Sequence, residues 1–332
     1  MKINKYKDVV GIGNAIVDIV AHGNKKFLSN HSMAIDGMVL VSSEKMKQLC
    51  EAVGPYTQMP GGSVANTMAG IASLGGTGTY IGKVRNDEIG IDFCNKLESM
   101  GINVPSIPAK QGLPTARSIV IITPDEHRSM ATYLGACSQM TPEDINESII
   151  SNHSITYLEG YLWDVPHAKE AMLKAAKYSK SNGHKVALTL SDSMCVERHR
   201  ESFLKLIKGH VDILFGNEEE IMSLYQVKTI HSAIEHVIPD CEFAAITSGA
   251  AGSIIVSGTN IHPVNSIIPD RVVDVTGAGD LYAAGVLFGI THGYKLEQIG
   301  LIGSIVASEA ISHVGARPQT DLRELIKGAH IP

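Results

Sequence analysis

Short apolar runs alternate with longer segments of helical periodicity through the middle of this chain, and this alternation constrains the fold more than any other feature. Polar residues or glycine bound the apolar runs, which occupy residues 155–158, 185–190, 211–215 and 243–247. Helical segments at residues 166–181 and 196–208 separate these runs. Strands that alternate with helices form right-handed βαβ units and a mostly parallel sheet that is covered on both faces. The sequence therefore predicts an α/β three-layer sandwich that binds its ligands at the carboxyl ends of the strands.

Two parts of the N-terminal half fit this rhythm poorly. Residues 17–42 and 115–134 contain β-like runs that turns interrupt. We expect them to form a small β-sheet that stands off the main domain as a lid, and edge strands with loops are the alternative. The end of the chain, residues 277–327, has helical character throughout. We expect the whole chain, residues 1–332, to form a single domain with this lid as a subdomain.

Composition argues against several classes of protein. The chain has 28 Lys and Arg against 34 Asp and Glu, a net charge of −6, whereas a nucleic-acid binder needs a basic stripe. Its five cysteines are scattered without a C-x-x-C pair, which argues against a disulfide framework or zinc site. No apolar run approaches the ~20 residues of a membrane helix, and the N-terminus lacks a signal-peptide core. We therefore expect a cytoplasmic protein that binds neither nucleic acid nor membrane.

The segment DVTGAGD, from Asp274 to Asp280, carries the strongest chemical signal. Gly277, Ala278 and Gly279 open an apolar helix, where small residues leave backbone N–H groups uncovered and the helix dipole adds positive charge. Such a helix start suits a phosphoryl group in transfer, and Asp280 beside it can act as the base for an attacking alcohol. An aspartate that caps a helix after a glycine turn is the alternative. That alternative would account for GAGD alone, but the full segment and the apolar helix after it favour the base.

This segment resembles the second signature of the ribokinase-like carbohydrate and nucleoside kinases, the PfkB family. Four other segments resemble further motifs of that family, in the same order along the chain. They are Gly61-Gly62-Ser63-Val64-Ala65-Asn66, residues 82–90, Asn217-Glu218-Glu219-Glu220, and Thr247-Ser248-Gly249-Ala250-Ala251-Gly252. The resemblance covers nearly the whole chain and implies the ribokinase-like fold with a small β-sheet lid. It also implies transfer of the γ-phosphoryl group of ATP to an alcohol.

The family motifs imply a nucleotide and metal side of the site. Asn217 and Glu220 would act on Mg²⁺ through water, which suits an ion that takes few protein ligands. A solvated acidic helix start is the alternative for this pair. Thr247, Gly249 and Gly252 would approach the nucleotide, since glycine lets the backbone come close, and an ordinary glycine turn is their alternative. ATP and Mg²⁺ are thus the implied cofactors, and the family allows a monovalent cation as well.

Three further residues join the nucleotide side by resemblance. Asp274 belongs to the same signature as the base. Arg128 resembles a lid arginine that reaches the phosphates in a forked geometry, and a salt bridge within the lid is its alternative. His313 lies near the end of a C-terminal helix that borders the adenine in the family. Neither a Walker A motif nor a complete dinucleotide fingerprint is present in the sequence.

The acceptor side is implied by Asn14, Asp18 and the Gly61-Gly62-Ser63 turn with Asn66. A carboxylate and an amide at a strand end suit the vicinal hydroxyls of a sugar. The spacing Gly-Asn-x-x-x-Asp and the serine at position 63 resemble adenosine kinases more than ribokinases. We therefore expect the 5′-hydroxyl of adenosine as the acceptor.

Glu159 departs from the adenosine kinase pattern, because it resembles a glutamate of the sugar kinases. It keeps ribose, fructose or another nucleoside open as the acceptor. Tyr161 and Trp163 follow closely and are candidates for an apolar wall beside a base, although a lone tryptophan is more often a core residue. A catalytically silent ligand sensor on the same fold is the non-enzyme alternative. A sensor has no use for a base, so Asp280 favours an enzyme, with a small molecule and ATP as partners and either a monomer or a homodimer as the assembly.

Overall fold

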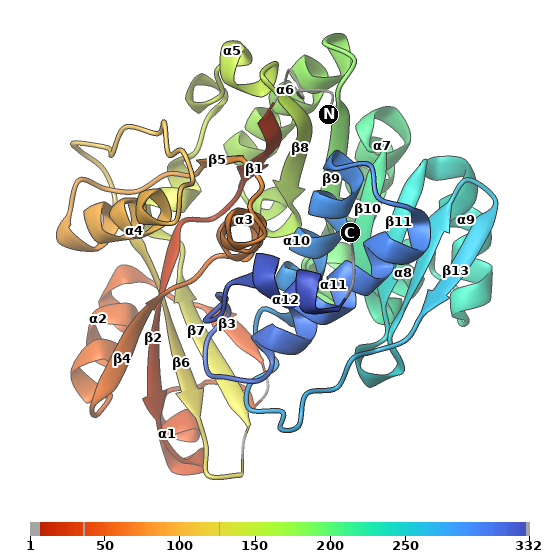
Figure 1. Cartoon of the computed structure of the whole chain (residues 1–332). Helices are drawn as coiled ribbons and strands as arrows, with labels where there is room; N and C mark the ends of the chain where they lie inside the picture. Colours follow the sequence, from red (N-terminus) through yellow and green to blue (C-terminus); the bar gives the residue numbers. More distant parts are fainter. Residues whose placement is uncertain (1–6, 36, 126, 330–332) are drawn as a thin grey trace.

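The computed structural model describes residues 7–35, 37–125 and 127–329, and its largest feature is a sheet of eight strands (Figure 1). From edge to edge the strands are β13 (Asn260–Val264), β12 (Ser253–Ser257), β11 (Phe243–Thr247), β10 (Ile213–Asn217), β9 (Lys185–Thr189), β8 (His153–Glu159), β1 (Lys7–Ile12) and β5 (Gly78–Ile81). All neighbours from β5 to β11 pair in parallel, and β12 and β13 add two antiparallel strands at one edge. The mostly parallel sheet predicted from the alternation of strands and helices is confirmed.

Helices cover both faces of this sheet. Val10 and Ile12 of β1 point into one apolar cluster and Val9 into another, as the two-residue period of a strand requires. The first cluster includes side chains of α6 (Pro166–Ser181), α7 (Ser193–His210), α8 (Glu218–Tyr225) and α9 (Ile230–Asp240). The second includes side chains of α3 (Ser63–Ser73), α4 (Glu88–Ser99), α10 (Ala278–Thr291) and α11 (Leu296–Ala310). Two layers of helices on one sheet make the predicted three-layer sandwich.

Side chains at the helix starts explain why several helices begin where they do. Asp87 accepts a hydrogen bond from the backbone N–H of Gly90 at 2.8 Å and caps α4, and Asp192 caps α7 through the N–H of Cys195 at 2.6 Å. Such caps satisfy N–H groups that have no partner inside the helix. The remaining short helical segments are α5 (Glu147–Ile150), α12 (Leu322–Gly328), η1 (Gly135–Gln139), η2 (Pro142–Asp144), η3 (Gly160–Asp164) and η4 (Gly249–Ala251).

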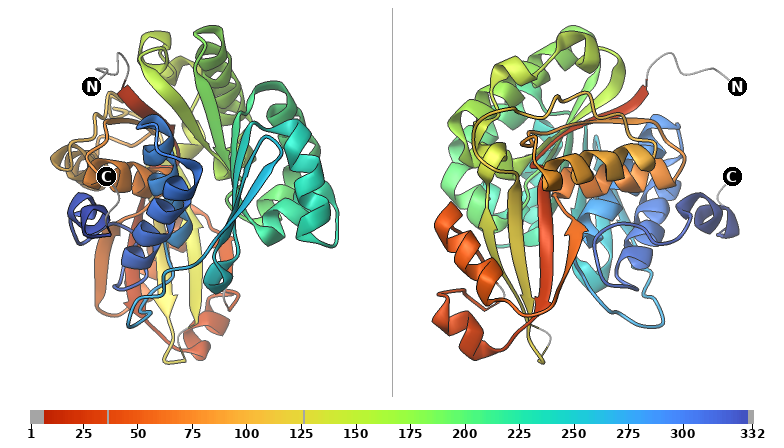
Figure 2. Two further views of the ribbon diagram at one scale, coloured as in Figure 1. Left: turned by 45° about the vertical axis from the view of Figure 1, so that its right-hand side comes forward. Right: turned by 90° about the vertical axis from the view of Figure 1, so that its left-hand side faces the viewer.

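A second, smaller sheet stands beside the main domain (Figures 1 and 2). Its strands, in order, are β3 (Met38–Leu40), β7 (Arg128–Tyr133), β6 (Ala116–Ile122), β2 (Ile16–His22) and β4 (Tyr56–Pro60). Helices α1 (Lys25–Asn30) and α2 (Ser43–Ala52) pack on one face of it, as the right-hand view of Figure 2 shows. The two segments expected to form a separate small sheet do so, and β4 is an additional strand that lies outside both.

The two faces of the small sheet differ in what they contact. Ile19, Ile119 and Ala131 belong to the core that the sheet shares with α1 and α2. Because side chains alternate along a strand, Asp18 and Arg128 lie on the opposite face. That face turns toward the main domain, since Arg128 forms an ion pair with a residue just before α10. We call it the inner face of the small sheet.

The C-terminal part of the chain differs from the expectation of continuous helix. The helices α10, α11 and α12 are present, but residues 311–321 between the last two are not helical. Gly315 has a φ of 99°, which favours glycine, and Pro318 follows it. Both residues oppose a continuing helix. This irregular segment reaches the candidate site described next.

Candidate functional site

Asp280 lies in the first turn of α10, where two side chains of α3 hold its carboxylate. The Ser63 hydroxyl donates to Oδ1 at 2.7 Å, and the Asn66 amide donates to Oδ2 at 2.9 Å. Thr67 donates to the backbone carbonyl oxygen of Asp280 at 3.1 Å. Burial raises the pKa of Asp280, and the hydrogen bonds from Asn66 and Ser63 offset part of that rise. The carboxylate is therefore fixed in place and a stronger base than an ordinary exposed aspartate.

The start of α10 presents unpaired backbone N–H groups beside this carboxylate. Gly277 precedes the helix with a φ of 78°, and a Cβ there would lie 2.4 Å from the Cβ of Ala316. A Cβ on Gly279 would meet no atom within 4 Å, so the space in front of it is open. Within the described part of the chain, no acceptor is bonded to the N–H groups of Gly279 and Asp280. Such a helix start is suited to an anion.

The Gly61-Gly62 turn brings the start of α3 against the connection between β1 and β2. A Cβ on Gly61 would lie 2.5 Å from Oδ2 of Asp18, so the glycine makes room for that carboxylate. Gly62 has a φ of 87°, and a Cβ there would lie 2.4 Å from the carbonyl oxygen of Asn14. The two glycines thus place Asn14 and Asp18 next to the α3 residues that hold the Asp280 carboxylate.

Asn14 and Asp18 offer hydrogen-bond acceptors that the described residues do not use. Oδ1 of Asn14 is buried and has no partner there. Burial raises the pKa of Asp18 to about 7, while Arg128 and Arg317 lower it and Asp280 raises it further. The charge of Asp274 raises it as well. Unfilled acceptors near a base suit a ligand that carries several hydroxyl groups.

Glu159, at the end of β8, is bonded by the protein itself. Oε1 accepts from Nδ2 of Asn14 at 2.7 Å, and Oε2 accepts from the backbone N–H groups of Asn14 and Val64, both at 3.2 Å. The residue is only 1% exposed. Burial raises its pKa to about 7, and these hydrogen bonds oppose the rise. Its place in the structure is that of a support for Asn14 and the start of α3.

Arg128 and Asp274 connect the small sheet to the main domain. The Arg128 guanidinium forms an ion pair with Oδ1 of Asp274. The Asp274 carboxylate also accepts from the backbone N–H groups of Thr276 at 2.9 Å and Gly315 at 3.0 Å. Burial raises the pKa of Asp274, but these hydrogen bonds and Arg128 hold it below its usual value. Arg128 thus forms a salt bridge to the main domain and not one confined to the small sheet, and its role at the phosphates stays a prediction.

A cavity of about 330 Å³ lies between the start of α10, the C-terminal half of α11 and the segment that follows β11. Thr247, Gly249 and Gly252, the residues expected on the nucleotide side, line it. Ala278 and Gly279 also line it, so the cavity reaches the open helix start. Its other lining residues are mainly apolar: Ala250, Ser266, Ile267, Ile268, Val272, Val275, Tyr282, Ser304, Ala307, Ser308 and Ile311.

His313 is absent from the residues that line this cavity. Its Nε2 lies 3.3 Å from a carboxylate oxygen of Glu309, one helical turn earlier. This is the i, i+4 spacing of neighbours on a helix face, so the side chain points back toward α11. The role of His313 at the adenine stays a prediction.

Asn217 and Glu220 form a reciprocal cap at the start of α8. Nδ2 of Asn217 donates to Glu220 at 2.7 Å, and Oδ1 of Asn217 accepts from the backbone N–H of Glu220 at 2.8 Å. Glu220 is 7% exposed, so the description of a solvated acidic helix start does not fit it. Burial raises the pKa of Glu220 to about 7, with further rises from Asp192 and Glu219. A cation would relieve this concentration of negative charge.

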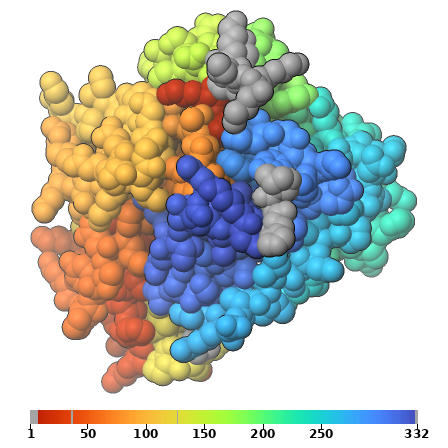
Figure 3. All heavy atoms as spheres, viewed as in Figure 1, coloured from red at the N-terminus to blue at the C-terminus, as the bar shows by residue number. Residues whose placement is uncertain are grey.

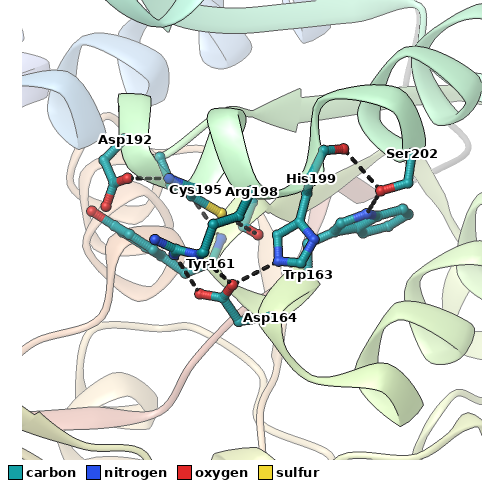
Figure 4. Close-up of polar contacts among 10 residues, drawn as sticks. Tyr161, Trp163, Asp164, Asp192, Cys195, Arg198, His199 and Ser202 are labelled. Carbon is teal, nitrogen blue, oxygen red and sulfur yellow. Dashed lines mark hydrogen bonds and ion pairs between the residues drawn. The ribbon is translucent and has the colours of Figure 1, made fainter.

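Tyr161 and Trp163 belong to η3 and lie against α7 and the residue before it (Figure 4). The Trp163 ring is 2% exposed, stacks on Phe203 with 5.4 Å between ring centroids and donates to Ser202 at 2.7 Å. It is a core residue, and the expectation of a wall was wrong for it. The Tyr161 hydroxyl is directed toward Asp192, and burial followed by the charge of Asp192 raises the Tyr161 pKa far above its usual value. The charges of Glu220 and Glu159 raise this pKa further, and the role of Tyr161 beside the acceptor stays a prediction.

Arg317 is a site residue that the sequence analysis missed. Its Nε lies 3.5 Å from Oδ1 of Asn66, and its charge acts on Asp18. It belongs to the irregular segment that was taken for helix, where its neighbours Gly315 and Pro318 were the available signal of a turn. These two residues predict a turn after α11, and turns of this kind often carry functional side chains.

Two features are absent from the described residues. No group of three or more His, Cys, Asp or Glu side chains is arranged to hold a metal ion there. In the same residues, no helix combines the length and the apolar character that crossing a bilayer requires.

Comparisons with known proteins identify a family pattern. The pattern of the pfkB family of carbohydrate kinases matches residues 35–322 of this chain. Among curated proteins, an adenosine kinase of Saccharomyces cerevisiae is 24% identical over 329 residues, which cover 92% of this chain and 95% of that protein.

Two solved structures are similar over almost the full length. The crystal structure of adenosine kinase from Sinorhizobium meliloti has a TM-score of 0.93 and 41% identity, covering 98% of this chain and 100% of that one. A probable sugar kinase from Rhizobium etli has the same TM-score and identity and covers 99% of each chain. The two names differ in the acceptor that they indicate.

Proposed function

The chain belongs to the pfkB family of carbohydrate kinases and is a phosphotransferase that acts on an alcohol group of a sugar or nucleoside, and we propose that it transfers the γ-phosphoryl group of ATP to the 5′-hydroxyl of adenosine. The observation that carries this proposal is the placement of Asp280. Two donors of α3 hold its carboxylate beside the unpaired N–H groups of the α10 start. A base and an anion site therefore lie side by side.

In this mechanism Asp280 accepts the proton of the attacking hydroxyl. Its pKa is raised by burial, so it is a better base than the usual aspartate assumed from the sequence alone. The N–H groups of Gly279 and Asp280 donate to the oxygens of the transferring group, where negative charge is held in the transition state. Closure of the small sheet as a lid would exclude water and prevent hydrolysis of ATP.

ATP and Mg²⁺ are the cofactors of the proposal. The apolar cavity beside α10 suits the adenine of ATP, and the open helix start at its end suits the phosphates. Asn217 and Glu220 would reach Mg²⁺ through water, which agrees with the buried negative charge around Glu220. When bound, the ion would neutralise charge on the phosphates.

The inner face of the small sheet supports a nucleoside as acceptor. Met38 and Met130 are register partners on neighbouring strands, and Leu40 lies two residues farther along. All three alternate with residues that pack on α1 and α2, so they belong to the inner face. Leu40 is 54% exposed. A base could cover this apolar patch while the ribose hydroxyls meet Asp18 and Asn14.

A sugar kinase is the second candidate, because Glu159 resembles the sugar-kinase glutamate. Its oxygens accept three hydrogen bonds from Asn14 and Val64. A glutamate whose oxygens already accept hydrogen bonds from the protein supports Asn14 and does not need a sugar hydroxyl as a further donor. This observation favours adenosine over ribose or fructose.

The proposal is tested by measuring ADP release from Mg-ATP with adenosine, other nucleosides, ribose, fructose and sugar phosphates as acceptors. We expect the highest kcat/KM for adenosine. The variant Asp280→Asn should fold normally and lose at least ~10²-fold in kcat, because it keeps the shape of the side chain but cannot accept the proton.

Asp92→Asn on α4 is the matched control, since that side chain is 42% exposed and pairs with Lys96 at the surface. It should turn over like the wild type. A preference for a free sugar would contradict the adenosine proposal, near-normal turnover by Asp280→Asn would contradict the base, and silence with all acceptors would favour a sensor.

A further inference from the structure

Arg317 is partly buried, and the guanidinium end of its side chain is enclosed next to Asn66 without a full set of partners. Its guanidinium lies over the ring of Phe93, 5.8 Å from the ring centroid. Nε is 3.5 Å from Oδ1 of Asn66, at the long end of hydrogen-bond distances. Nη1 and Nη2 are buried and have no partner within the described part of the chain. A charged group is costly to bury in this way, so the position calls for a function.

The segment that carries Arg317 comes from the far end of the chain. Residues 311–321 connect α11 to α12, and Figure 3 shows the C-terminal part of the chain lying against the N-terminal part. Gly315 in the same segment donates to Asp274. The turn that carries Arg317 is therefore hydrogen-bonded to Asp274, in the segment just before α10.

Asn66 stands between Arg317 and Asp280. Its Oδ1 faces the guanidinium, and its Nδ2 donates to the carboxylate at 2.9 Å. An amide has one acceptor and one donor end, so only this orientation satisfies a cation on one side and a carboxylate on the other. The reverse orientation would set the amide oxygen against the carboxylate and the amide N–H groups against the cation.

We propose that Arg317 is a positioning residue for phosphoryl transfer, in which its guanidinium fixes the Asn66 amide so that the amide N–H always faces the carboxylate of Asp280. This role rests on the proposed kinase reaction. It differs from the roles assigned above, because Arg317 acts through Asn66 and does not touch the reacting atoms.

The charges around Asp280 explain why this orientation is needed. Asp18 on β2 and Glu159 on β8 are both close enough for Asp280 to raise their pKa values, and Tyr157 on β8 is affected in the same way. The groups of α3 that face Asp280 are the neutral donors Ser63 and Asn66. Burial lowers the pKa of Arg317 to about 10, so it remains a cation at neutral pH. Its charge acts on Asp18, one of these acidic neighbours, and it reaches Asp280 only through Asn66.

The test compares the pH dependence of kcat and KM for wild type, Arg317→Met and Arg317→Lys, with ATP and the best acceptor. We expect Arg317→Met to lower kcat about tenfold at pH 7 and to move its acidic limb to higher pH by about half a unit or more. Asp280 must be deprotonated to act, and its pKa rises when the amide is free to turn. Arg317→Lys should restore the limb, and KM for ATP should change little.

A double-variant cycle shows whether the effect passes through Asn66. In an Asn66→Ala background, Arg317→Met should lower kcat by less than about twofold, because the relay is already broken. The exposed Arg323→Met on α12 is the control and should keep the wild-type profile. If Arg317→Met does not fold, Arg317→Gln, which removes the charge but keeps donors, takes its place.

The outcomes separate this role from the proposed function. An equal fall in kcat at every pH, with a lower Tm, shows a packing role only and overturns the inference. Full effects in both backgrounds overturn it as well. If the wild type is active and the Arg317 variants keep the acidic limb of its kcat–pH profile, only the role of Arg317 is refuted. If the wild type is inactive with every acceptor, the proposed function is refuted and this role with it.

Discussion

Glu159 is a buried carboxylate whose oxygens are held by donors of the protein. Replacing it with glutamine keeps the shape but puts an amide N–H group against the N–H donors of Asn14 and Val64. We predict that Glu159→Gln lowers the free energy of unfolding by about 1–3 kcal/mol, the range for a buried group left without its partner. It should also raise KM for the acceptor more than it lowers kcat, because Asn14 loses its support.

Chemical denaturation and steady-state kinetics check this prediction. The control is Glu242→Gln, since Glu242 is 65% exposed and pairs with Lys185 at the surface, where such pairs contribute little. An unchanged KM in Glu159→Gln would show that the carboxylate does not support the acceptor site.

At the level of single residues, the sequence indicated candidate members of the site but not their partners. Asp280 and the glycines before it could be proposed from sequence because one local segment contains both the helix start and the carboxylate. The partners of Glu159 lie 145 and 95 residues away along the chain, so no local pattern could indicate that the protein itself occupies this side chain. Arg317 was missed for the same reason, because its importance lies in its contact with Asn66, 251 residues earlier.

The start of α10 gives a prediction at the level of the element. Gly277→Ala would place a methyl group 2.4 Å from Ala316 on a backbone with φ 78°, so it should lower both Tm and kcat. Gly279→Ala meets no atom within 4 Å, so it should leave Tm nearly unchanged yet reduce kcat at least tenfold, about 1.4 kcal/mol of transition-state stabilisation. Its methyl group would fill the space in front of the open N–H groups.

Thermal unfolding and kcat, measured on both variants side by side, distinguish strain from obstruction. Equal losses of stability in the two variants would contradict the account of Gly279 as the open floor of an anion site.

Elements with a strong local period were predicted well, and those defined by tertiary pairing were not. The helix at residues 166–181 has the predicted bounds because its apolar positions recur at helical spacing. The strand β4 has exposed or half-buried residues throughout and pairs with only one neighbour, β2. An edge strand of this kind has no alternation to reveal it, and the pairing that creates it is not local.

At the scale of the whole molecule, the site depends on segments that the chain order keeps apart. The small sheet is built by parallel pairing of β2 with β6, in which Ile16 is the partner of Ala116. Arg128 then connects this sheet to Asp274 of the main domain. Composition and period predicted both bodies, but the contact between them arises only when the sheets are assembled.

Burial of acidic groups at this junction leads to a prediction for the stability of the whole protein. Burial raises the pKa values of Asp18, Glu159 and Glu220 to about 7, above the values of about 3.9–4.3 in an unfolded chain. Between pH 4 and 7 the folded protein therefore binds more protons than the unfolded chain, so the free energy of unfolding falls as the pH rises through this window. His153, whose pKa burial lowers to about 4, acts in the opposite direction, and so do His31, His184 and His210, whose pKa values burial also lowers. The three acids have the larger combined effect in this prediction, and Asp280, whose pKa burial also raises, acts with them.

We expect the protein without ligands to be more stable to chemical denaturation at pH 5 than at pH 8, and each acid alone contributes about 1.4 kcal/mol per unit of pKa difference. The double variant Asp18→Asn with Glu220→Gln should flatten this dependence, because two of the three groups can no longer ionise. Stability that increases from pH 5 to pH 8 in the wild type would contradict the prediction and would show that these carboxyls are charged in the folded protein without cost. If the prediction holds, Mg-ATP and the acceptor should increase the free energy of unfolding more at pH 8 than at pH 5, because at pH 8 the proposed ligands contact ionised groups.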